Sequence, residues 1–108
     1  MALDAKIIDP MTGEIDPELS TQIDAEQHAA LFAKIRQQAS RFPLLTRMSD
    51  YYSDTEYTTE ELESLISEVE HTGGLFEPGS PVYKFTGPFH SMCCLAFIRK
   101  KCVALYAD

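Results

Sequence analysis

The sequence predicts an α+β fold, in which three helices pack against a small antiparallel sheet formed by an N-terminal hairpin and a C-terminal strand. Three observations support this fold class. Two segments carry apolar residues at helical spacing, a third is apolar almost throughout, and both ends of the chain contain short strand-like segments. The chain has 108 residues, of which 44% are hydrophobic, enough for one hydrophobic core. We therefore expect a single globular domain over residues 1–108.

The first two strands are expected around a turn near the N-terminus. Residues 9–13 carry Pro10 at the second position of the turn and Gly13 at its end, which is typical of a hairpin connection. The turn predicts short strands at residues 6–8 and 14–15.

A polar connector over residues 16–22 is expected to lead into the first helix. Asp24 and Gln27 have the spacing of a capping box, so the helix is expected to begin there and to end at about Ser40. Its apolar positions follow helical spacing: Leu31, Phe32, Ile35 and Ala39. The alternative for the start of the chain is that residues 1–22 form a partly extended arm, because chain ends are often loosely held.

A second helix is expected to begin near Thr58, where Glu61 completes another capping box. Its buried stripe has the spacing of one helix face: Leu62, Leu65, Ile66 and Val69. Glu61 and Glu68 are expected on one exposed flank of this helix. Gly73 and Gly74 are expected to end it, because glycine is common just after a helix.

The third helix is expected to start at residues 87–88, because proline suits the first helical position. Residues 89–98 are apolar nearly all round, which predicts the central buried helix. Residues 75–86, which contain Pro78, Gly79 and Pro81, are expected to form a loop, and residues 82–85 are a candidate short strand within it. Residues 102–106 either continue the helix or form a strand, and we favour a strand that closes the sheet with the N-terminal hairpin.

The charge of the chain limits the classes of partner. Seventeen acidic residues against nine basic ones give a net charge of −8. Binding to nucleic acid or to anionic lipid requires an electropositive face, so we expect neither nucleic acid nor a membrane as partner. Three cysteines, two of them adjacent, suit a reducing compartment better than a disulfide framework. Because the N-terminus also lacks a signal-peptide pattern, we expect a cytoplasmic location.

The most informative feature is an acidic segment that contains no basic residue. Residues 50–70 hold eight Asp and Glu, three Tyr and not one Lys or Arg. Opposite charge speeds the encounter with a basic protein, and tyrosine supplies contact area at a low entropic cost. We therefore expect a basic protein partner. The residues expected to contact it are Asp50, Tyr51, Tyr52, Asp54, Glu56, Tyr57, Glu60, Glu63 and Glu70. The alternative is a solvated acidic face on a structural or oligomerisation subunit.

No pattern in the chain predicts catalysis, a cofactor or a bound metal. The acidic segment fails as a calcium loop, because Tyr52 and Thr55 occupy a ligand position and the glycine position. His90 lies one helical turn from Cys93 and Cys94, but a structural zinc site needs a second pair of ligands. We predict buried structural thiols in this apolar stretch. A thiol- or metal-dependent small enzyme that uses this region is the alternative function class.

The middle of the chain resembles a known class of proteins. The residues that carry the resemblance are Phe42, Pro43, Leu44, Leu45, Tyr51, Asp54, Thr55, Tyr57, Glu61, Leu65, Ile66 and Glu68. In this pattern, residues 42–68 resemble small acidic bacterial immunity-type proteins of polymorphic toxin systems. The resemblance implies a non-enzymatic inhibitor that binds a basic toxin and covers its active site with an acidic surface.

Overall fold

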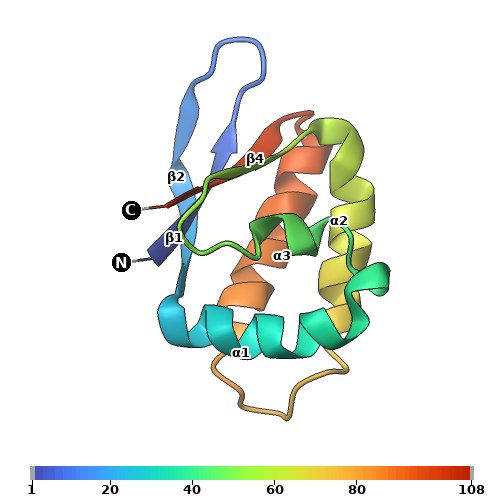
Figure 1. Cartoon of the computed structure of the whole chain (residues 1–108). Coiled ribbons are helices and arrows are strands. Elements are labelled where there is room, and N and C mark those ends of the chain that lie inside the picture. Colours follow the sequence, from blue (N-terminus) through green and yellow to red (C-terminus); the bar gives the residue numbers. More distant parts are fainter. Residues whose placement is uncertain (1, 108) are drawn as a thin grey trace.

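The computed structural model describes residues 2–107 as an antiparallel four-stranded sheet with helices packed on one of its faces (Figure 1). The strands are β1 (Ala2–Ile8), β2 (Ile15–Asp24), β3 (Thr55–Tyr57) and β4 (Cys102–Ala107), in the sheet order β2-β1-β4-β3. The helices are α1 (Ala25–Ile35), α2 (Thr59–Thr72) and α3 (Tyr83–Ile98). The predicted α+β fold is confirmed, with three helices and a sheet that joins the N-terminal hairpin to the C-terminal strand.

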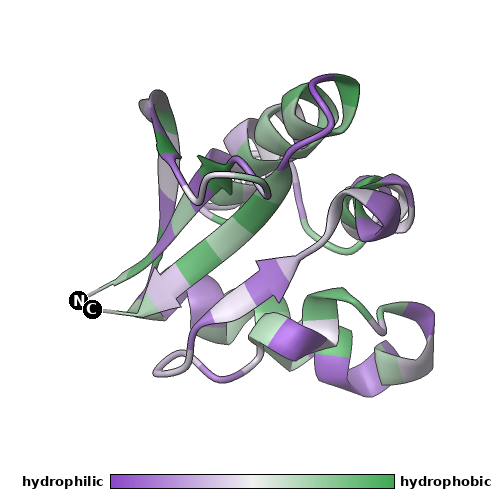
Figure 2. Ribbon diagram, turned by 90° about the horizontal axis from the view of Figure 1, so that it is seen from above, coloured by the Kyte–Doolittle hydropathy of each residue, from purple (hydrophilic) through white to green (hydrophobic). Residues whose placement is uncertain are grey.

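The two ends of the chain meet in the middle of the sheet. Strand β4 pairs with β1 along its whole length, so that Leu105 lies opposite Ala5, and this confirms the strand predicted at residues 102–106. The view from above shows that β4 is apolar over most of its length, whereas β3 carries hydrophilic residues (Figure 2). Residues 102–105 of β4 are all buried, so both of its faces are covered there, which suits a continuous apolar run.

The expected polar connector at residues 16–22 is wrong, because these residues belong to β2. Strand β2 lies at the edge of the sheet and pairs with β1 from Ala2 to Ile8. Ile23 is its fully buried apolar residue, and Leu19 packs against the core from its margin. An edge strand with so few buried side chains has almost no alternating pattern, so its sequence reads as a loop. Within the described residues, the pairing of β1 with β2 does not support the alternative of a partly extended arm over residues 1–22.

The first two helices begin as predicted. Asp24 and Gln27 form a complete capping box before α1, and Thr58 and Glu61 form one before α2. Helix α1 ends five residues before Ser40 and gives way to a tighter 3-10 helix, η1 (Arg36–Arg41).

Helix α3 begins four residues earlier than predicted, and the prediction of a candidate strand at residues 82–85 is wrong. Val82 precedes the helix, Phe85 lies in its first turn, and both side chains are fully buried. Burial of these side chains outweighs the strand preference of the segment, and it places Pro88 inside the helix.

A single hydrophobic core lies between the sheet and the helices. Its largest fully buried side chains come from every layer of the fold: Leu3, Ile7, Ile23, Leu31, Phe32, Ile35, Phe42, Leu45, Met48, Tyr57, Phe85 and Phe89. Helix α2 packs against α3, and α1 crosses below them (Figure 1). Within residues 2–107, the helices lie on one face of the sheet; on the other face Glu56 is exposed, and the side chains of Asp4, Lys6 and Tyr106 are half-buried.

Candidate protein-binding surface

The acidic segment begins within the connection between α1 and β3, and hydrogen bonds hold this connection in place. A second short 3-10 helix, η2 (Leu45–Met48), follows η1 in this connection. Both carboxylate oxygens of Glu68 lie 3.1–3.2 Å from the Leu44 amide nitrogen, and one lies 2.9 Å from that of Leu45. The expected exposure of Glu68 is wrong. Its side chain is only 8% exposed, because it turns inward to accept these amide hydrogens at the start of η2.

Arg47 supplies the positive charge that the acidic segment itself lacks. Its guanidinium donates hydrogen bonds to the Glu61 carboxylate and to the backbone carbonyl of Glu56, and it lies 4.9 Å from the centre of the Tyr57 ring. The Arg47 carbonyl in turn accepts a hydrogen bond from the Thr55 hydroxyl at 3.0 Å. The Thr58 amide and the Arg47 charge both stabilise ionised Glu61, so the pKa of this carboxyl is lowered. One arginine thus ties the loop, β3 and α2 together.

Residues 50–54 form a compact turn at the end of this connection. The Asp50 carboxylate accepts hydrogen bonds from the Tyr52 amide at 2.9 Å and from the Ser53 hydroxyl at 2.8 Å. These two bonds lower the pKa of Asp50, because they stabilise the ionised carboxylate. Tyr52 projects from this turn with 72% of its surface exposed. The turn therefore presents an exposed aromatic ring beside a fixed negative charge.

The acidic turn continues onto the face of the sheet opposite the helices through Asp54 and Glu56. One Asp54 oxygen lies 2.8 Å from the amide nitrogen of Ala107 and fastens the turn to the end of β4. Glu56 lies opposite Ala104 in the strand register, and Tyr106 follows on the same side of β4. Partial burial, followed by the nearby Glu56 and Asp54 charges, raises the pKa of Tyr106. We call Asp50, Tyr52, Asp54, Glu56 and Tyr106 the acidic edge.

Two of the tyrosines expected at the partner face inward instead. Tyr57 is fully buried, and its hydroxyl donates a hydrogen bond to the Leu44 carbonyl at 2.6 Å. The prediction that Tyr57 contacts a partner is therefore wrong, because its place on β3 points it into the core. Tyr51 is half-buried, and its ring centre lies 5.1 Å from that of the buried His28. It covers the core more than it offers a contact surface.

The three glutamates predicted on α2 lie apart from the acidic edge. Helix α2 starts at the end of β3 that is distant from the turn, and it runs away from there (Figure 1). Glu60 and Glu70 are ten residues apart on this helix, a separation of about 15 Å along its axis. Glu60 borders a hollow of about 510 Å³ with Phe97 and Lys100. Glu63 is exposed between them, and Glu70 contacts His90.

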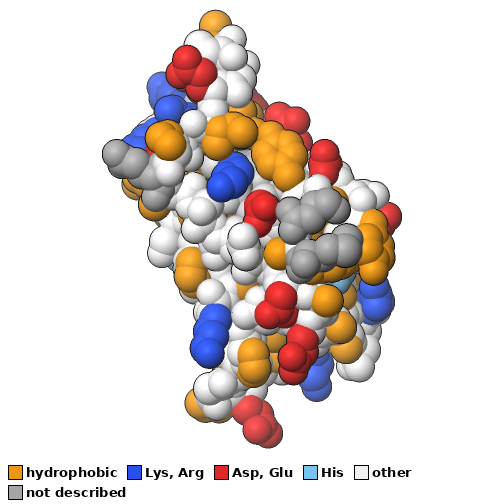
Figure 3. Space-filling view, turned by 90° about the vertical axis from the view of Figure 1, so that its left-hand side faces the viewer, with side chains coloured by type: hydrophobic (Ala, Val, Ile, Leu, Met, Phe, Trp, Pro, Cys, Tyr) orange, Lys and Arg blue, Asp and Glu red, His pale blue; other side chains and the backbone are white. Residues whose placement is uncertain are grey.

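The eight carboxylates of the segment thus divide into two groups. Five accept hydrogen bonds from the protein itself: Asp50, Asp54, Glu61, Glu68 and Glu70. Within residues 2–107, the other three side chains make no hydrogen bond or ion pair: Glu56, Glu60 and Glu63. On the face shown in Figure 3, acidic side chains are separated by hydrophobic and neutral ones and do not merge into one patch.

Two residues of this surface were not found from the sequence. Tyr106 lies 52 positions after Asp54 in the chain, and only the pairing of β3 with β4 brings them together. Asp4 lies opposite Tyr106 on β1, beside the acidic edge, and Lys6, opposite Ala104 on the same face, bounds this edge on β1. One buried oxygen of Asp4 has no hydrogen-bond partner among the described residues. The sequence signal for β3 is the placing of the strand-favouring residues Thr55 and Tyr57 on either side of Glu56, and in the structure these two are buried.

Comparison with family models, with curated proteins and with solved structures gives no match to this chain. The resemblance of residues 42–68 to immunity-type proteins therefore stays a prediction from the sequence. None of the helices within residues 2–107 is both long and apolar enough to cross a membrane. Over the same residues, no three His, Cys, Asp or Glu side chains are grouped in a way that would hold a metal ion.

Proposed function

We propose that this protein is a non-enzymatic binding module that recognises a basic protein through its acidic edge. The observation that carries the proposal is the turn at residues 50–54, where the exposed ring of Tyr52 lies among carboxylates that are fixed by hydrogen bonds. A rigid aromatic side chain at the centre of a polar surface is a common anchor for protein binding.

The way in which the turn is held supports this proposal. Arg47 is hydrogen-bonded to Thr55 and Glu56 of β3, which follows the turn, and Asp54 fastens the turn to β4. A contact surface that is ordered before binding loses little conformational entropy when the complex forms. The free carboxylate of Glu56 and the ring of Tyr106 extend the contact surface over the face of the sheet opposite the helices.

The specific form that we propose is an immunity-type inhibitor, in which the acidic edge blocks the active site of a basic toxin. The support for this form is the resemblance of residues 42–68 and the net charge of −8. A basic active-site surface, such as that of an enzyme acting on nucleic acid, is complementary to the acidic edge.

The first test is co-expression of the protein with the product of the adjacent gene, followed by size-exclusion chromatography and a growth assay. We expect a co-eluting complex and protection from a neighbour that is toxic alone. Tyr52→Ala should weaken the complex by about 2 kcal/mol, roughly 30-fold in affinity, if Tyr52 is an anchor. Glu56→Lys should slow association, and this effect should shrink as salt is added.

Glu77→Lys is the matched control for the charge reversal, because Glu77 is exposed in the loop between α2 and α3, away from the acidic edge. It changes the net charge by the same amount as Glu56→Lys. Equal effects of the two reversals would show that net charge alone matters and would overturn the acidic edge as the contact surface. If Tyr52→Ala leaves the affinity of the complex unchanged, Tyr52 is not the anchor of the contact surface.

A further inference from the structure

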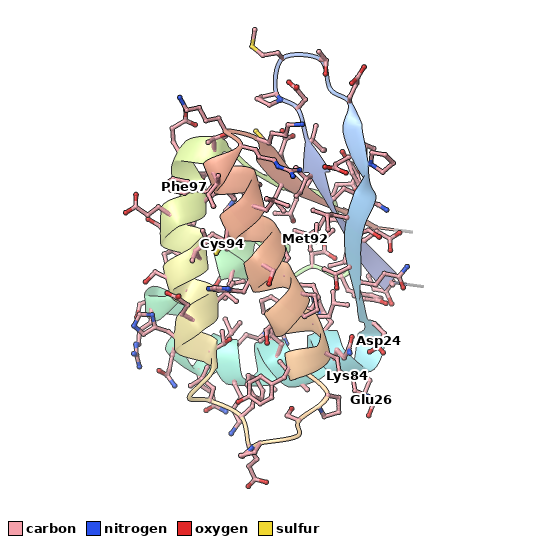
Figure 4. The ribbon with its side chains drawn as sticks, turned by 180° about the vertical axis from the view of Figure 1, so that it is seen from behind. Asp24, Glu26, Lys84, Met92, Cys94 and Phe97 are labelled. Carbon is pink, nitrogen blue, oxygen red and sulfur yellow. The ribbon has the colours of Figure 1, made fainter. Side chains whose placement is uncertain are left out.

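Where α2 packs against α3, three side chains that can act together in proton transfer lie next to one another. The proposed binding function does not use them. Glu70 comes from α2, and His90 and Cys94 come from α3. The His90 Nε2 atom lies 3.1 Å from a Glu70 carboxylate oxygen, and the His90 Nδ1 atom lies 3.8 Å from the Cys94 sulfur. Viewed from behind, Cys94 lies on the side of α3 that faces α2 (Figure 4).

The order of these contacts fixes the role of each imidazole nitrogen. A carboxylate only accepts hydrogen bonds, so the Nε2 atom of neutral His90 must carry the hydrogen that points to Glu70. The Nδ1 atom then has a free electron pair directed toward Cys94. This arrangement of thiol, base and orienting carboxylate is the one that activates a cysteine nucleophile.

Cys94 is also the most accessible of the three thiols. Cys93 is fully buried, and burial raises its pKa to about 12. Cys102 is 6% exposed in the sheet, whereas Cys94 is half-buried at the helix seam. Neighbouring residues of a helix point in different directions, so Cys93 cannot readily form a disulfide with Cys94.

Solvent reaches the base of this arrangement through a groove between the two helices. The groove has a volume of about 210 Å³, and both Glu70 and His90 line it. Tyr83 and Thr86 form part of its wall. A small molecule therefore has space beside His90, one helical turn from the Cys94 sulfur.

We propose that Cys94 is a site of reversible exchange with low-molecular-weight disulfides, in which His90 accepts the thiol proton and Glu70 positions the imidazole. The Cys94 proton moves to the His90 Nδ1 atom, and the resulting thiolate attacks one sulfur of the small disulfide. The sulfur–sulfur bond of the reagent breaks as the bond to Cys94 forms, and the departing thiolate takes the proton from Nδ1. Cys94 is oxidised to a mixed disulfide, and the other half of the reagent is reduced to a free thiol.

The test is to incubate the folded protein with 2-hydroxyethyl disulfide, an uncharged reagent, and to follow adduct formation by mass spectrometry. We expect one adduct, mapped to Cys94, which is removed by an added thiol. Cys94→Ser should abolish it on the same timescale. Labelling of Cys93 or Cys102 at the rate of Cys94, or no adduct before unfolding, would overturn the proposal.

Variants of His90 and Glu70 show whether the reactivity of Cys94 depends on proton transfer or only on its exposure to solvent. His90→Gln should slow the reaction by about a hundredfold if the imidazole acts as a general base. Glu70→Ala should slow it less, and Glu70→Gln should restore part of the rate because its amide oxygen still accepts the Nε2 hydrogen. Glu63→Gln removes a charge from the same helix without touching His90 and should leave the rate unchanged. Equal rates for the folded wild-type and His90→Gln proteins would overturn the role of the base.

Discussion

The inner and outer sides of the acidic segment both carry glutamates, but these glutamates have different roles on the two sides. On the inner side, Glu68 and Glu61 accept backbone amide hydrogens and hold η2, β3 and α2 together. On the outer side, the free carboxylates of Glu56 and Glu63 face solvent. A dense run of acids in a sequence is therefore not one charged surface, because part of it serves the fold.

The variant with the largest expected effect on stability is Glu68→Ala. It leaves the amide groups of Leu44 and Leu45 without their acceptor in a largely buried site, so we expect a loss of about 3 kcal/mol in the free energy of unfolding. Urea denaturation followed by circular dichroism measures this loss. Glu63→Ala, on the same helix but exposed, is the control and should change the value by no more than about 0.5 kcal/mol. Similar losses in the two variants would contradict the division into inner and outer carboxylates.

A second test concerns the inward-facing tyrosine. Tyr57→Phe removes the hydroxyl that donates to the Leu44 carbonyl and keeps the buried ring. We expect a loss of about 1 kcal/mol, the net contribution of one hydrogen bond, because the Leu44 carbonyl still accepts the amide hydrogen of Arg47. Tyr52→Phe is the matched control, since the hydroxyl of Tyr52 is on an exposed side chain. A neutral result for Tyr57→Phe would show that water replaces the lost hydrogen bond.

The third test uses pH to examine how the inner side is anchored to α1. The His28 Nε2 atom lies 2.9 Å from the Met48 carbonyl oxygen, and burial lowers the pKa of His28 below 6.5. The unfolded chain therefore takes up a proton more readily than the folded one. Stability from this site is complete above about pH 6.5 and is lost as the pH falls through the lower folded pKa.

Urea midpoints measured between about pH 7.5 and 5.5 should fall for the wild type and fall less for His28→Gln. The glutamine keeps a donor for the Met48 carbonyl but does not titrate. His71 and His90 are on α2 and α3 and remain in both proteins, so they do not cause a difference between them. Parallel pH profiles would show that His28 makes no contribution to the pH dependence.

The sequence predicts this fold best where each segment carries its own signal. The capping boxes at Asp24 and Thr58 are local, and both helices begin there. Strand β2 was missed because an edge strand needs few buried side chains. The start of α3 was misplaced because Val82 and Phe85 are held by tertiary burial, which overrides local preference.

The candidate surface was harder to predict than the fold, because its residues are assembled by strand pairing. The sequence places Tyr52, Asp54 and Glu56 close together, and the structure keeps them on one edge. It does not indicate that Tyr57 points inward, since that depends on which face of β3 meets the core. Nor does it bring Tyr106 beside Asp54, because that contact needs the register of β3 against β4.

The smallest expected effect is that of neutralising the free carboxylates. The triple change Glu56→Gln, Glu60→Gln and Glu63→Gln removes charges that make no hydrogen bond or ion pair within residues 2–107. Relief of repulsion in a chain of net charge −8 should raise the free energy of unfolding slightly, by about 0.5 kcal/mol or less. The gain should disappear at high salt, because exposed charges are then screened. A clear loss of stability would mean that the outer carboxylates also stabilise the fold. It would contradict the division into inner, structural carboxylates and outer, solvent-facing ones.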